Sequence, residues 1–315
     1  MTTSSAIIPT YHRPDDLNNC LESILRQTAL PTELIIVDDG DLPGFPMQGD
    51  FEKRGVRCKF LEKEIPGVTE SRNLGAKSAS GDILIFLEDD VVLFDDYIEQ
   101  LLSTFERHAG TDVAGVGGII DNDRFQSAKV MLQRIPNLLF GMSGLREGRI
   151  LRSGFATDYG STERPIREEQ DVDFLLGGVS AFKRSVFDEF QFSNRYKSKN
   201  GYGQGEDKEF SYRVSRKYRL LVNPKARLYH YCAPKTDYNR HIRGRATVLS
   251  KYYFFRDQVK KSPVDWFFFW YATFGYVLYR TAITLVSFKK REWQRLSGII
   301  SGMADAVKGR DLDSL

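Results

Sequence analysis

Three consecutive acidic residues, Glu88, Asp89 and Asp90, directly follow the apolar run Ile83–Leu87. Carboxylate oxygens in such a row are hard ligands that suit Mg²⁺ or Mn²⁺, and a cation held there can also bind phosphate oxygens. The alternative for a run of acidic residues is a solvated turn. Because these acids stand at the predicted carboxyl end of a strand, the sequence favours a site for a metal ion and a diphosphate.

A tyrosine and a second acidic pair follow two other predicted strands. The first apolar run ends in Pro9, Thr10 and Tyr11, and the second is followed by Asp38 and Asp39. An aromatic ring can lie against a base, and carboxylates can accept hydrogen bonds from a ribose or a base N–H, so these residues indicate a nucleoside pocket. The alternative for an Asp-Gly sequence is a plain turn. No G-x-G-x-x-G pattern follows the first run, which argues against a nicotinamide-cofactor site.

Short apolar runs alternate with amphipathic stretches between residues 6 and 111, a pattern typical of βαβ units around a mostly parallel sheet. The predicted strands are Ala6–Pro9, Leu34–Val37, Arg57–Leu61 and Ile83–Leu87. One predicted helix begins at Pro14, and another runs from Thr69 to Ser80 with Gly81 as its cap. Ligands bind at the carboxyl ends of the strands in such sheets, so we expect the two acidic clusters to face one crevice.

The rest of the chain changes character twice. From about residue 112 to residue 234 the periodicity weakens, which predicts a mixed and partly antiparallel region. Between Lys235 and Arg295 thirteen basic residues stand against four acidic ones, and all three tryptophans fall in this stretch. We therefore expect three parts: a nucleotide-binding half over 1–111, an acceptor-binding and catalytic half over 112–234, and a helical, basic and aromatic extension over 235–315.

Five segments in a fixed order carry a family resemblance. They are IIPTYHRPDDLNNCLESILRQT, LIIVDDG, GVTESRNLGAKSASGDILIFLEDDVVL, LLGGVSAFKRSVF and GYGQGEDKEFSYR, spread over about residues 6 to 232. Together they resemble the family 2 inverting glycosyltransferases of the GT-A fold. The resemblance implies a Rossmann-like mixed sheet flanked by helices. It also implies a nucleotide-sugar donor, Mn²⁺ or Mg²⁺ as cofactor, and a single displacement that inverts the anomeric carbon.

The resemblance also assigns site residues by their positions in these motifs. The implied donor-binding set is Pro9, Thr10, Tyr11, Arg13, Asp38, Asp39, Arg72, Asn73, Glu88 and Asp89. Of the acidic run, Asp90 would bind the metal, and Asp89 would bind the ribose or the metal. Glu88 stands where the family commonly has Asp. His230 could complete the metal shell, since imidazole can join carboxylates on Mn²⁺, and the alternative is a structural histidine.

A further carboxylate is needed to deprotonate the acceptor hydroxyl as it attacks. The Glu206-Asp207 pair fits this need, and in the family the second acid of such a pair is usually the base. We therefore predict Asp207 as the general base, with Glu206 as the second choice. The alternative is a patch of charge at a helix N-terminus. No Gln is followed by Arg-Trp in the Q-x-x-R-W spacing of processive synthases, so we expect one sugar to be added per encounter.

The apolar stretch Trp266–Phe288 is interrupted by Arg280, and the piece before it is shorter than the ~18 residues of a usual spanning helix. Its aromatic residues are flanked by Lys260-Lys261 and by Lys289-Lys290-Arg291. This pattern favours a segment that lies at an anionic membrane surface. The start of the chain does not resemble a signal peptide, so we expect the cytoplasmic face, peripheral or monotopic. The alternative is a buried helical subdomain or a homodimer interface.

Composition excludes several other classes. The 45 basic and 42 acidic residues are too balanced to indicate nucleic-acid binding, and the three cysteines have no paired spacing. We expect a lipid-linked or glycan acceptor, with UDP as the default donor nucleotide. A sugar nucleotidyltransferase would carry a glycine-rich phosphate loop after the first strand, which this chain lacks. The Glu88 departure leaves a non-catalytic scaffold as a further alternative, against which the four carboxylates of the two motifs argue.

Overall fold

The chain folds into two units, each assembled from segments that are far apart in the sequence. The structure is a computed structural model of residues 1–315. It describes residues 2–40, 42–121, 128–159, 166–196, 204–231, 239–310 and 312. Unit 1 comprises residues 1–124, 159–192 and 210–233, and unit 2 comprises residues 125–158, 193–209 and 234–315. The functional parts 1–111, 112–234 and 235–315 stay predictions, and the boundary at 234 lies outside the described residues.

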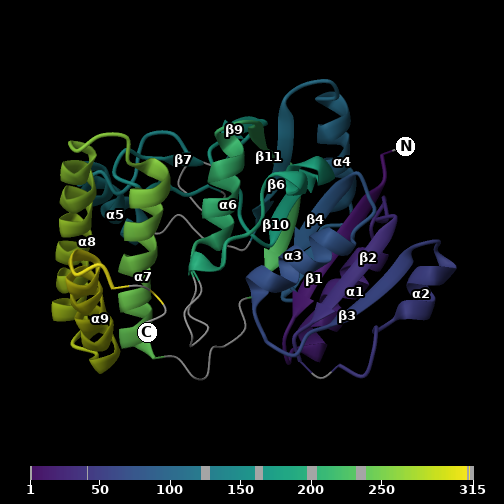
Figure 1. Ribbon diagram of the computed structural model, residues 1–315, viewed down its shortest axis with the longest axis horizontal. Helices are drawn as coiled ribbons and strands as arrows, with labels where there is room; N and C mark the ends of the chain where they lie inside the picture. Colours follow the sequence, from purple (N-terminus) through teal and green to yellow (C-terminus); the bar gives the residue numbers. More distant parts are fainter. Residues whose placement is uncertain are drawn as a thin grey trace. The chain divides into compact units, whose positions relative to one another are not determined.

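Unit 1 is built on a mixed sheet with the strand order β3-β2-β1-β4-β10-β6-β11-β5 in the described chain, and β9 pairs with β11. The strands are β1 Ser4–Thr10, β2 Glu33–Asp38, β3 Arg57–Glu62, β4 Ile83–Leu87, β5 Val91–Leu93, β6 Val113–Ile120, β9 Gln170–Val172, β10 Val179–Lys183 and β11 Arg219–His230. Strands β1 to β4 are parallel because helices connect them, and β10 lies antiparallel between β4 and β6 (Figure 1). The predicted α/β class is confirmed.

Helices of unit 1 return the chain between these strands. They are α1 Pro14–Leu25, α2 Gln48–Lys53, α3 Val68–Ser78 and α4 Tyr97–Arg107. The start of α1 at Pro14 is as predicted, whereas α3 ends at Ser78 rather than at Ser80. Gly81 is therefore not a helix cap. A Cβ at Gly81 would lie 2.6 Å from the backbone of Ser4, so the residue is small because β1 passes against it.

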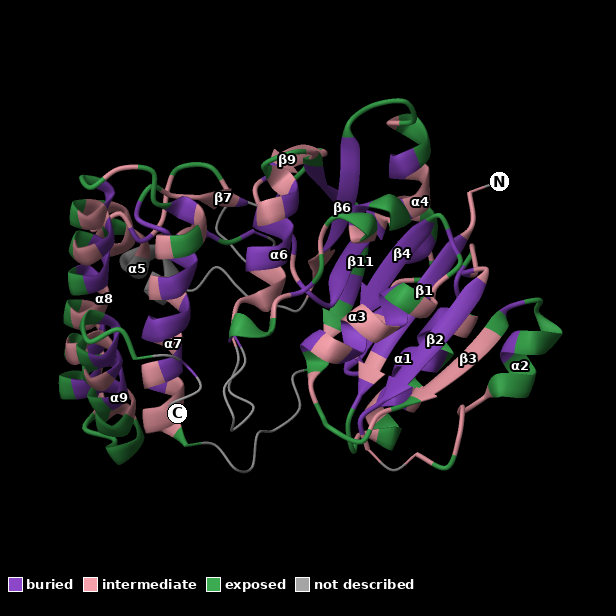
Figure 2. Ribbon diagram, in the orientation of Figure 1, coloured by how far each residue is buried: buried purple, intermediate pink, exposed green. Residues whose placement is uncertain are grey.

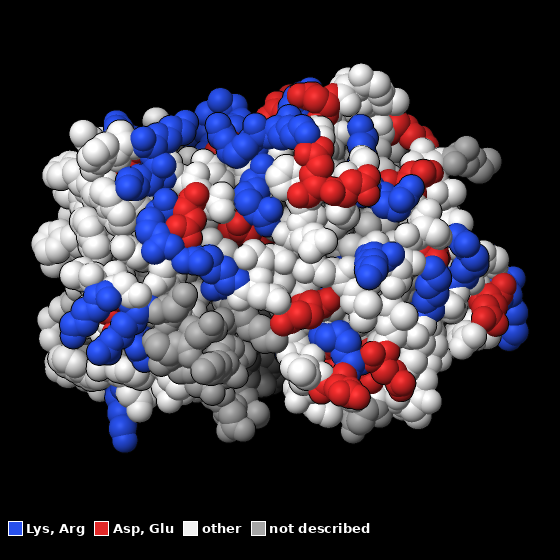
Figure 3. Space-filling model, in the orientation of Figure 1, with Lys and Arg blue, Asp and Glu red and all other residues white. Residues whose placement is uncertain are grey.

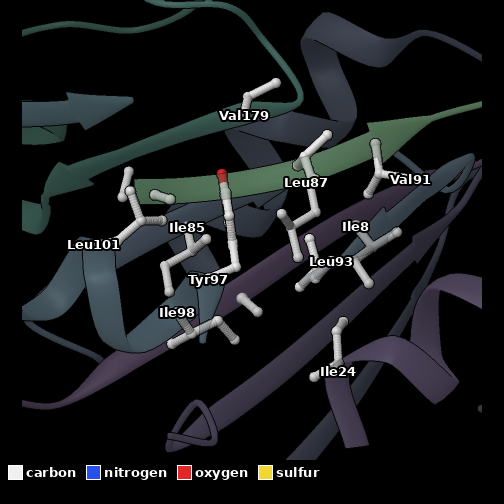
Figure 4. Packing of buried hydrophobic residues seen from close by; sticks show 14 of the residues in the cluster. Ile8, Ile24, Ile85, Leu87, Val91, Leu93, Tyr97, Ile98, Leu101 and Val179 are labelled. Atoms are coloured by element: carbon white, nitrogen blue, oxygen red, sulfur yellow. The ribbon is translucent and has the colours of Figure 1, made fainter. Parts of the chain in front are cut away.

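Strands β1, β2 and β4 are buried along nearly their whole length, which explains why they form unbroken apolar runs in the sequence (Figure 2). Side chains of α1 and α4 pack against one face of these strands. Figure 4 shows Ile24 of α1 and Ile98 and Leu101 of α4 beside Ile8 and Ile85 of the sheet. This packing holds the strand ends that carry the acidic residues.

Unit 2 is mainly helical. Its longer helices are α5 Ala128–Leu139, α7 Arg240–Phe254, α8 Asp265–Ser287 and α9 Lys290–Val307; a π-helical turn, Phe255–Val259, follows α7, and β7 Arg149–Ile150 pairs with β8 Ala156–Thr157. Helix α6, Glu206–Ser215, begins in unit 2 and continues in unit 1 from Phe210. Short 3-10 turns cover Arg184–Asp188 and Asn194–Tyr196. The predicted C-terminal helical extension is confirmed. None of the helices described combines the length and the apolar character needed to cross a membrane.

Helices α7 and α9 bring their backbones into contact at glycines. A Cβ at Gly298 would lie 2.0 Å from the carbonyl oxygen of His241, and one at Gly244 would lie 2.3 Å from the carbonyl oxygen of Arg295. Gly302 is one turn beyond Gly298 and is similarly close to α7. This small-x-x-x-small spacing lets two helices approach more closely than larger side chains would permit. The packing of α9 on α7 therefore depends on glycine at these positions.

Glu33 is fully buried at the start of β2 and holds three segments together. Its carboxylate accepts hydrogen bonds from the hydroxyls of Ser5 (2.6 Å) and Ser80 (3.0 Å), and it pairs with the Lys59 ammonium at 2.9 Å. Burial would raise the pKa of Glu33, but these hydrogen bonds outweigh it and lower the pKa to about 2. The charged form is therefore the stabilising one.

We predict that Gly298→Ala lowers the free energy of unfolding by about 1–3 kcal/mol, because the added methyl group has no room and α7 and α9 must separate. Urea denaturation followed by circular dichroism measures the change. Gly49→Ala is the matched control, since Gly49 is exposed on α2 with no atom within 4 Å of an added Cβ. It should be neutral or slightly stabilising. Equal midpoints for the two variants would contradict the close packing.

We predict that Glu33→Gln lowers stability by about 2 kcal/mol at neutral pH, a figure that allows for solvent near the partly exposed Lys59. The pKa of Glu33 is lower in the folded protein than its usual value of 4.5, so the stabilisation is fully present above that pH and is lost as the pH falls toward 2. Denaturation curves at several pH values should show the two proteins converging over this interval. A difference that stays constant down to pH 2 would be the contrary result.

Candidate functional site

Four strand ends come together at one edge of the sheet in unit 1. The in-register parallel pairing of β1 with β2 and β4 makes these strands end at the same edge. Strand β11 runs in the same direction as these strands, because it is parallel to β6, and β10 lies antiparallel between β6 and β4. His230 at its carboxyl end therefore reaches the same edge, where the antiparallel pairing of β11 with β5 places it opposite Val91. The N–H of Tyr231 donates a hydrogen bond to the carbonyl of Asp90 at 2.8 Å. This register brings His230 to the acidic run from a distant part of the chain.

Glu88, Asp90 and His230 form a cluster suited to a divalent cation. The Nε2 atom of His230 lies 3.0 Å from Glu88 Oε2 and 3.0 Å from Asp90 Oδ1. One ligand atom from each residue falls within 4.8 Å of the others. Two carboxylates and an imidazole fit Mn²⁺ or Mg²⁺, with positions left over for phosphate oxygens. We refer to these three residues as the metal cluster.

The two carboxylates of the metal cluster create a negative charge that a cation would offset. Hydrogen bonds with Asp90 and Glu88 raise the pKa of His230 to about 10, although burial acts in the opposite direction. Burial would also raise the pKa of Glu88, but the hydrogen bond with His230 and the charge of Arg72 lower it overall. A proton on His230 thus offsets part of the negative charge, and a divalent cation at the same place would offset more of it.

Gly178 explains how the longer Glu88 side chain fits. A Cβ at position 178 would lie 2.6 Å from Glu88 Cγ, so only glycine lets this side chain pass. From the sequence, the resemblance assigns the Gly177-Gly178 pair to a loop on the acceptor side, where glycine lets the backbone approach a sugar, and the alternative is a tight turn. In the structure the pair directly precedes β10, and Gly178 makes room for Glu88.

Asp89 lies beside the metal cluster but has other partners. Its carboxylate accepts hydrogen bonds from Thr10 Oγ1 (2.9 Å) and from Arg13 Nη1 (3.1 Å). The same Arg13 nitrogen donates to Asp90 Oδ2 at 3.2 Å. Burial raises the pKa of Asp89, in spite of the nearby Arg13 charge. Thr10 and Arg13 therefore orient the acidic run, and the structure brings both of them to the site.

Asp39 is surrounded by hydrogen-bond donors. It accepts from Lys63 Nζ (2.9 Å), from the Gly67 N–H (2.8 Å) and from Ser71 Oγ (2.7 Å). Lys63 and Ser71 were not singled out from the sequence, because neither stands in an acidic or aromatic motif. Their positions directly after β3 and within α3 were the available signal. The adjacent Asp38 caps the turn after β2 by accepting from backbone N–H groups, including that of Gly40 at 3.0 Å.

Of the remaining predicted donor residues, two are at β1 and one is beside the metal cluster. Tyr11 is 49% exposed just beyond β1, and Pro9 lies within β1 opposite Val37. Arg72 is buried, with Nη2 3.4 Å from Glu88 Oε1, so it belongs to the surroundings of the metal cluster.

Asn73 has a different environment from its neighbour Arg72. Its amide group exchanges two hydrogen bonds, each of 2.9 Å, with the backbone of Phe192. The structure therefore does not bring the Asn73 side chain to the metal cluster. These two bonds instead tie α3 to the segment that follows β10.

Glu206 and Asp207 lie in the first turn of α6. They belong to unit 2, whereas the metal cluster belongs to unit 1. In the same turn Lys208 donates to Asp158 at 2.8 Å, and the buried Glu209 accepts from Gln258 at 3.1 Å. Acidic residues are favourable at a helix N-terminus, so this position agrees with both interpretations of the pair. The role of Asp207 stays a prediction.

Comparisons of the sequence with known proteins identify similar glycosyltransferases. The sequence model of the family described as "Glycosyl transferase family 2" matches residues 5–190. A glucosyl-dolichyl phosphate glucuronosyltransferase of Haloferax volcanii is 29% identical over 187 residues, which are 58% of this chain and 53% of that relative. The chain therefore spans about half the length of that relative.

Solved structures share the fold at low identity. Residues 1–349 of S. aureus TarS match with a TM-score of 0.59 at 13% identity, over 97% of this chain and 81% of that chain. A complex of TarS with UDP-GlcNAc also matches. A mannosyltransferase of Pyrobaculum calidifontis in complex with GDP-Man and Mn²⁺ matches with a TM-score of 0.55 at 15% identity, over 98% and 88% of the two chains. At such identity the likeness shows the fold.

We predict that Asp90→Ala and His230→Ala each weaken Mn²⁺ binding at least tenfold, because each removes one of three converging ligands. Electron paramagnetic resonance titration of free Mn²⁺ measures the dissociation constant without any substrate. Glu189→Ala is the matched control, since Glu189 pairs with Lys217 on the surface of unit 1. It should bind Mn²⁺ as the unmodified protein does. Loss of binding in the control alone would place the metal elsewhere.

Proposed function

The chain belongs to glycosyl transferase family 2, and from this membership we propose that it moves one sugar from a nucleotide-sugar donor to a lipid-linked or glycan acceptor. The proposed reaction is metal-dependent and inverts the anomeric carbon. The observation that carries the proposal is the metal cluster of Glu88, Asp90 and His230 at the carboxyl edge of the sheet. Two of the predicted donor-binding residues contact it, since Arg13 donates to Asp90 and Arg72 lies against Glu88.

The proposed donor site divides into a nucleoside part and a diphosphate part. The exposed ring of Tyr11 would stack on the base, and Asp39 would accept a hydrogen bond from the nucleoside in exchange for one of its present donors. Arg72 would hold phosphate oxygens beside Glu88. When bound by the metal cluster, Mn²⁺ or Mg²⁺ supplies positive charge against the diphosphate as it leaves.

The transfer step needs a base on the acceptor side of the sugar. In the proposed mechanism Asp207 takes the proton of the acceptor hydroxyl while that oxygen forms a bond to the anomeric carbon. The bond from this carbon to the diphosphate breaks at the same time, and its electron pair leaves with the nucleoside diphosphate. Attack opposite the leaving group inverts the configuration.

The names of similar proteins bear on the nature of the donor and of the acceptor. The TarS complex contains UDP-GlcNAc and the complex of the Pyrobaculum enzyme contains GDP-Man, so proteins with this fold bind donors with different nucleotides. We propose UDP as the nucleotide of this chain's donor. The name of the Haloferax relative specifies a dolichyl phosphate, which supports a lipid-linked acceptor. Such an acceptor would place the enzyme at the cytoplasmic face of a membrane, held peripherally or monotopically through its C-terminal helices.

Donor hydrolysis tests the proposed function. We predict that the protein with Mn²⁺ releases a nucleoside diphosphate from one of the UDP-, GDP- or dTDP-sugars, and that EDTA or Asp90→Ala abolishes the release. Chromatography of the nucleotide products measures this outcome. Release of pyrophosphate would instead identify a nucleotidyltransferase, and no release with any donor, together with no transfer, would identify a binding scaffold.

We predict that Asp207→Asn lowers sugar transfer by ~10²-fold or more while Mn²⁺ and donor affinities stay unchanged, because only the proton acceptor is removed. Glu206→Gln is the matched variant and should retain most of the activity. Initial rates with a saturating donor, together with equilibrium binding of the donor, separate the two effects. If Glu206→Gln is inactive and Asp207→Asn is active, the roles within the pair are reversed.

A further inference from the structure

Helix α8 exposes a continuous apolar stripe along one side. Its members recur every three or four residues and so lie on a single helical face. Phe267 is 66% exposed and Phe274 is 54% exposed, which are large values for such side chains. The stripe consists of Val264, Phe267, Tyr271, Phe274, Leu278, Ala282 and Leu285.

Both charged residues of α8 are kept off this stripe. Arg280 is buried and forms an ion pair with Glu292 of α9. Asp265 is also buried, pairs with Arg152, and accepts hydrogen bonds from the backbone before the helix. The sequence places Arg280 as an interruption of the apolar run, but in the fold it leaves the outer face of the helix uncharged. The stripe therefore continues past it to Leu285.

The stripe is widened by neighbouring residues of unit 2. Ile135 and Leu139 at the end of α5 are exposed, and the ring of Phe140 packs on Tyr271 at 5.5 Å and on Phe274 at 6.4 Å. We call the stripe together with Ile135 and Leu139 the apolar face. Contiguous exposed apolar surface of this kind marks an interaction site in most proteins.

Basic residues stand at both ends of α8. Lys260 and Lys261 precede the helix, and Lys289, Lys290 and Arg291 follow it, all of them exposed. A helix of this length extends about 35 Å, so the two groups are separated by the whole apolar stripe. Figure 3 shows the edge of the molecule over α8 largely free of charged atoms. Beyond the helix, Phe288 adopts a left-handed conformation and is 80% exposed.

We propose that the apolar face inserts into the interfacial layer of an anionic bilayer, with α8 parallel to the surface and both basic groups on lipid headgroups. The inner side of α8 is occupied by the Arg280–Glu292 pair and by packing against α9, so only the outer side is available to lipid. Apolar insertion and attraction to anionic headgroups then act on the same face. The proposal rests on the proposed function in assuming that the acceptor is at a membrane.

Vesicle sedimentation with the full-length protein tests the proposal. We expect binding to phosphatidylglycerol vesicles, weaker binding to phosphatidylcholine vesicles, and partial release by salt. Replacing both Phe267 and Phe274 by Ser should lower the affinity at least tenfold, because the inserted aromatic surface is lost. The matched control is Ile65→Ser, which changes an equally exposed apolar residue of unit 1 and should bind unchanged.

The charge contribution is tested separately. Replacing Lys289, Lys290 and Arg291 by Gln should lower binding to anionic vesicles by about fivefold for each residue and leave weak binding to neutral vesicles unchanged. Equal sedimentation of all variants would overturn the proposal. A stable dimer that dissociates when Phe267 and Phe274 are replaced, without any vesicle binding, would assign the apolar face to a second copy of the chain.

The proposal and the proposed function can fail independently. Metal-dependent donor hydrolysis without vesicles should be the same in the unmodified protein and in the Phe267/Phe274 variant, because the metal cluster is in unit 1. Vesicle binding by a protein that neither hydrolyses nor transfers from any donor would support the membrane role of the apolar face and overturn the proposed function. Donor hydrolysis without vesicle binding would support the proposed function and overturn the membrane role.

Discussion

Repulsion among three consecutive carboxylates is the constraint on which the edge of the sheet depends. Like charges at this spacing are costly to bury unless cations offset them. Arg13 bridges two of the carboxylates, Arg72 lies against the third, and His230 spans Glu88 and Asp90. The three cations come from different parts of the fold, since Arg13 directly precedes α1, Arg72 lies in α3 and His230 ends β11. The packing that brings these elements to the end of β4 therefore also offsets the charge of the acidic run.

The parts of this arrangement that are local in sequence could be predicted from it. Ile83–Leu87 was predicted with the bounds of β4 because a buried parallel strand is an unbroken apolar run, and an acidic run beyond such a strand can only lie at its carboxyl end. The family membership and the fold class were predicted correctly for the same reason. A motif that consists of consecutive residues can be recognised in the sequence without knowledge of tertiary contacts.

Features that depend on distant register could not be predicted with the same certainty. His230 was left open between ligand and structural residue, because its place is set by the pairing of β11 with β5. Asn73 stands beside Arg72 in the same motif, yet its partner is the backbone of Phe192, which no local pattern indicates. The prediction of Gly81 as a helix cap was wrong. This residue is glycine because the backbone of β1, which is distant in the sequence, passes directly against it. In each case the deciding contact is tertiary.

The pairing of charged side chains explains both the acidic edge of the sheet and the uncharged outer face of α8. At the sheet edge, three carboxylates are concentrated, and cationic side chains of the protein offset their charge. On α8, the charge in the middle of an apolar segment is withdrawn by pairing with α9. Arg280 would cost several kcal/mol if it faced hydrocarbon, whereas an inward arginine with a carboxylate partner leaves the outer face uniform. In an isolated α8 the charge of Arg280 would have no such partner, because Glu292 belongs to α9. The apolar face is therefore a property of the packed unit rather than of the segment, and hydropathy along the sequence underestimates it.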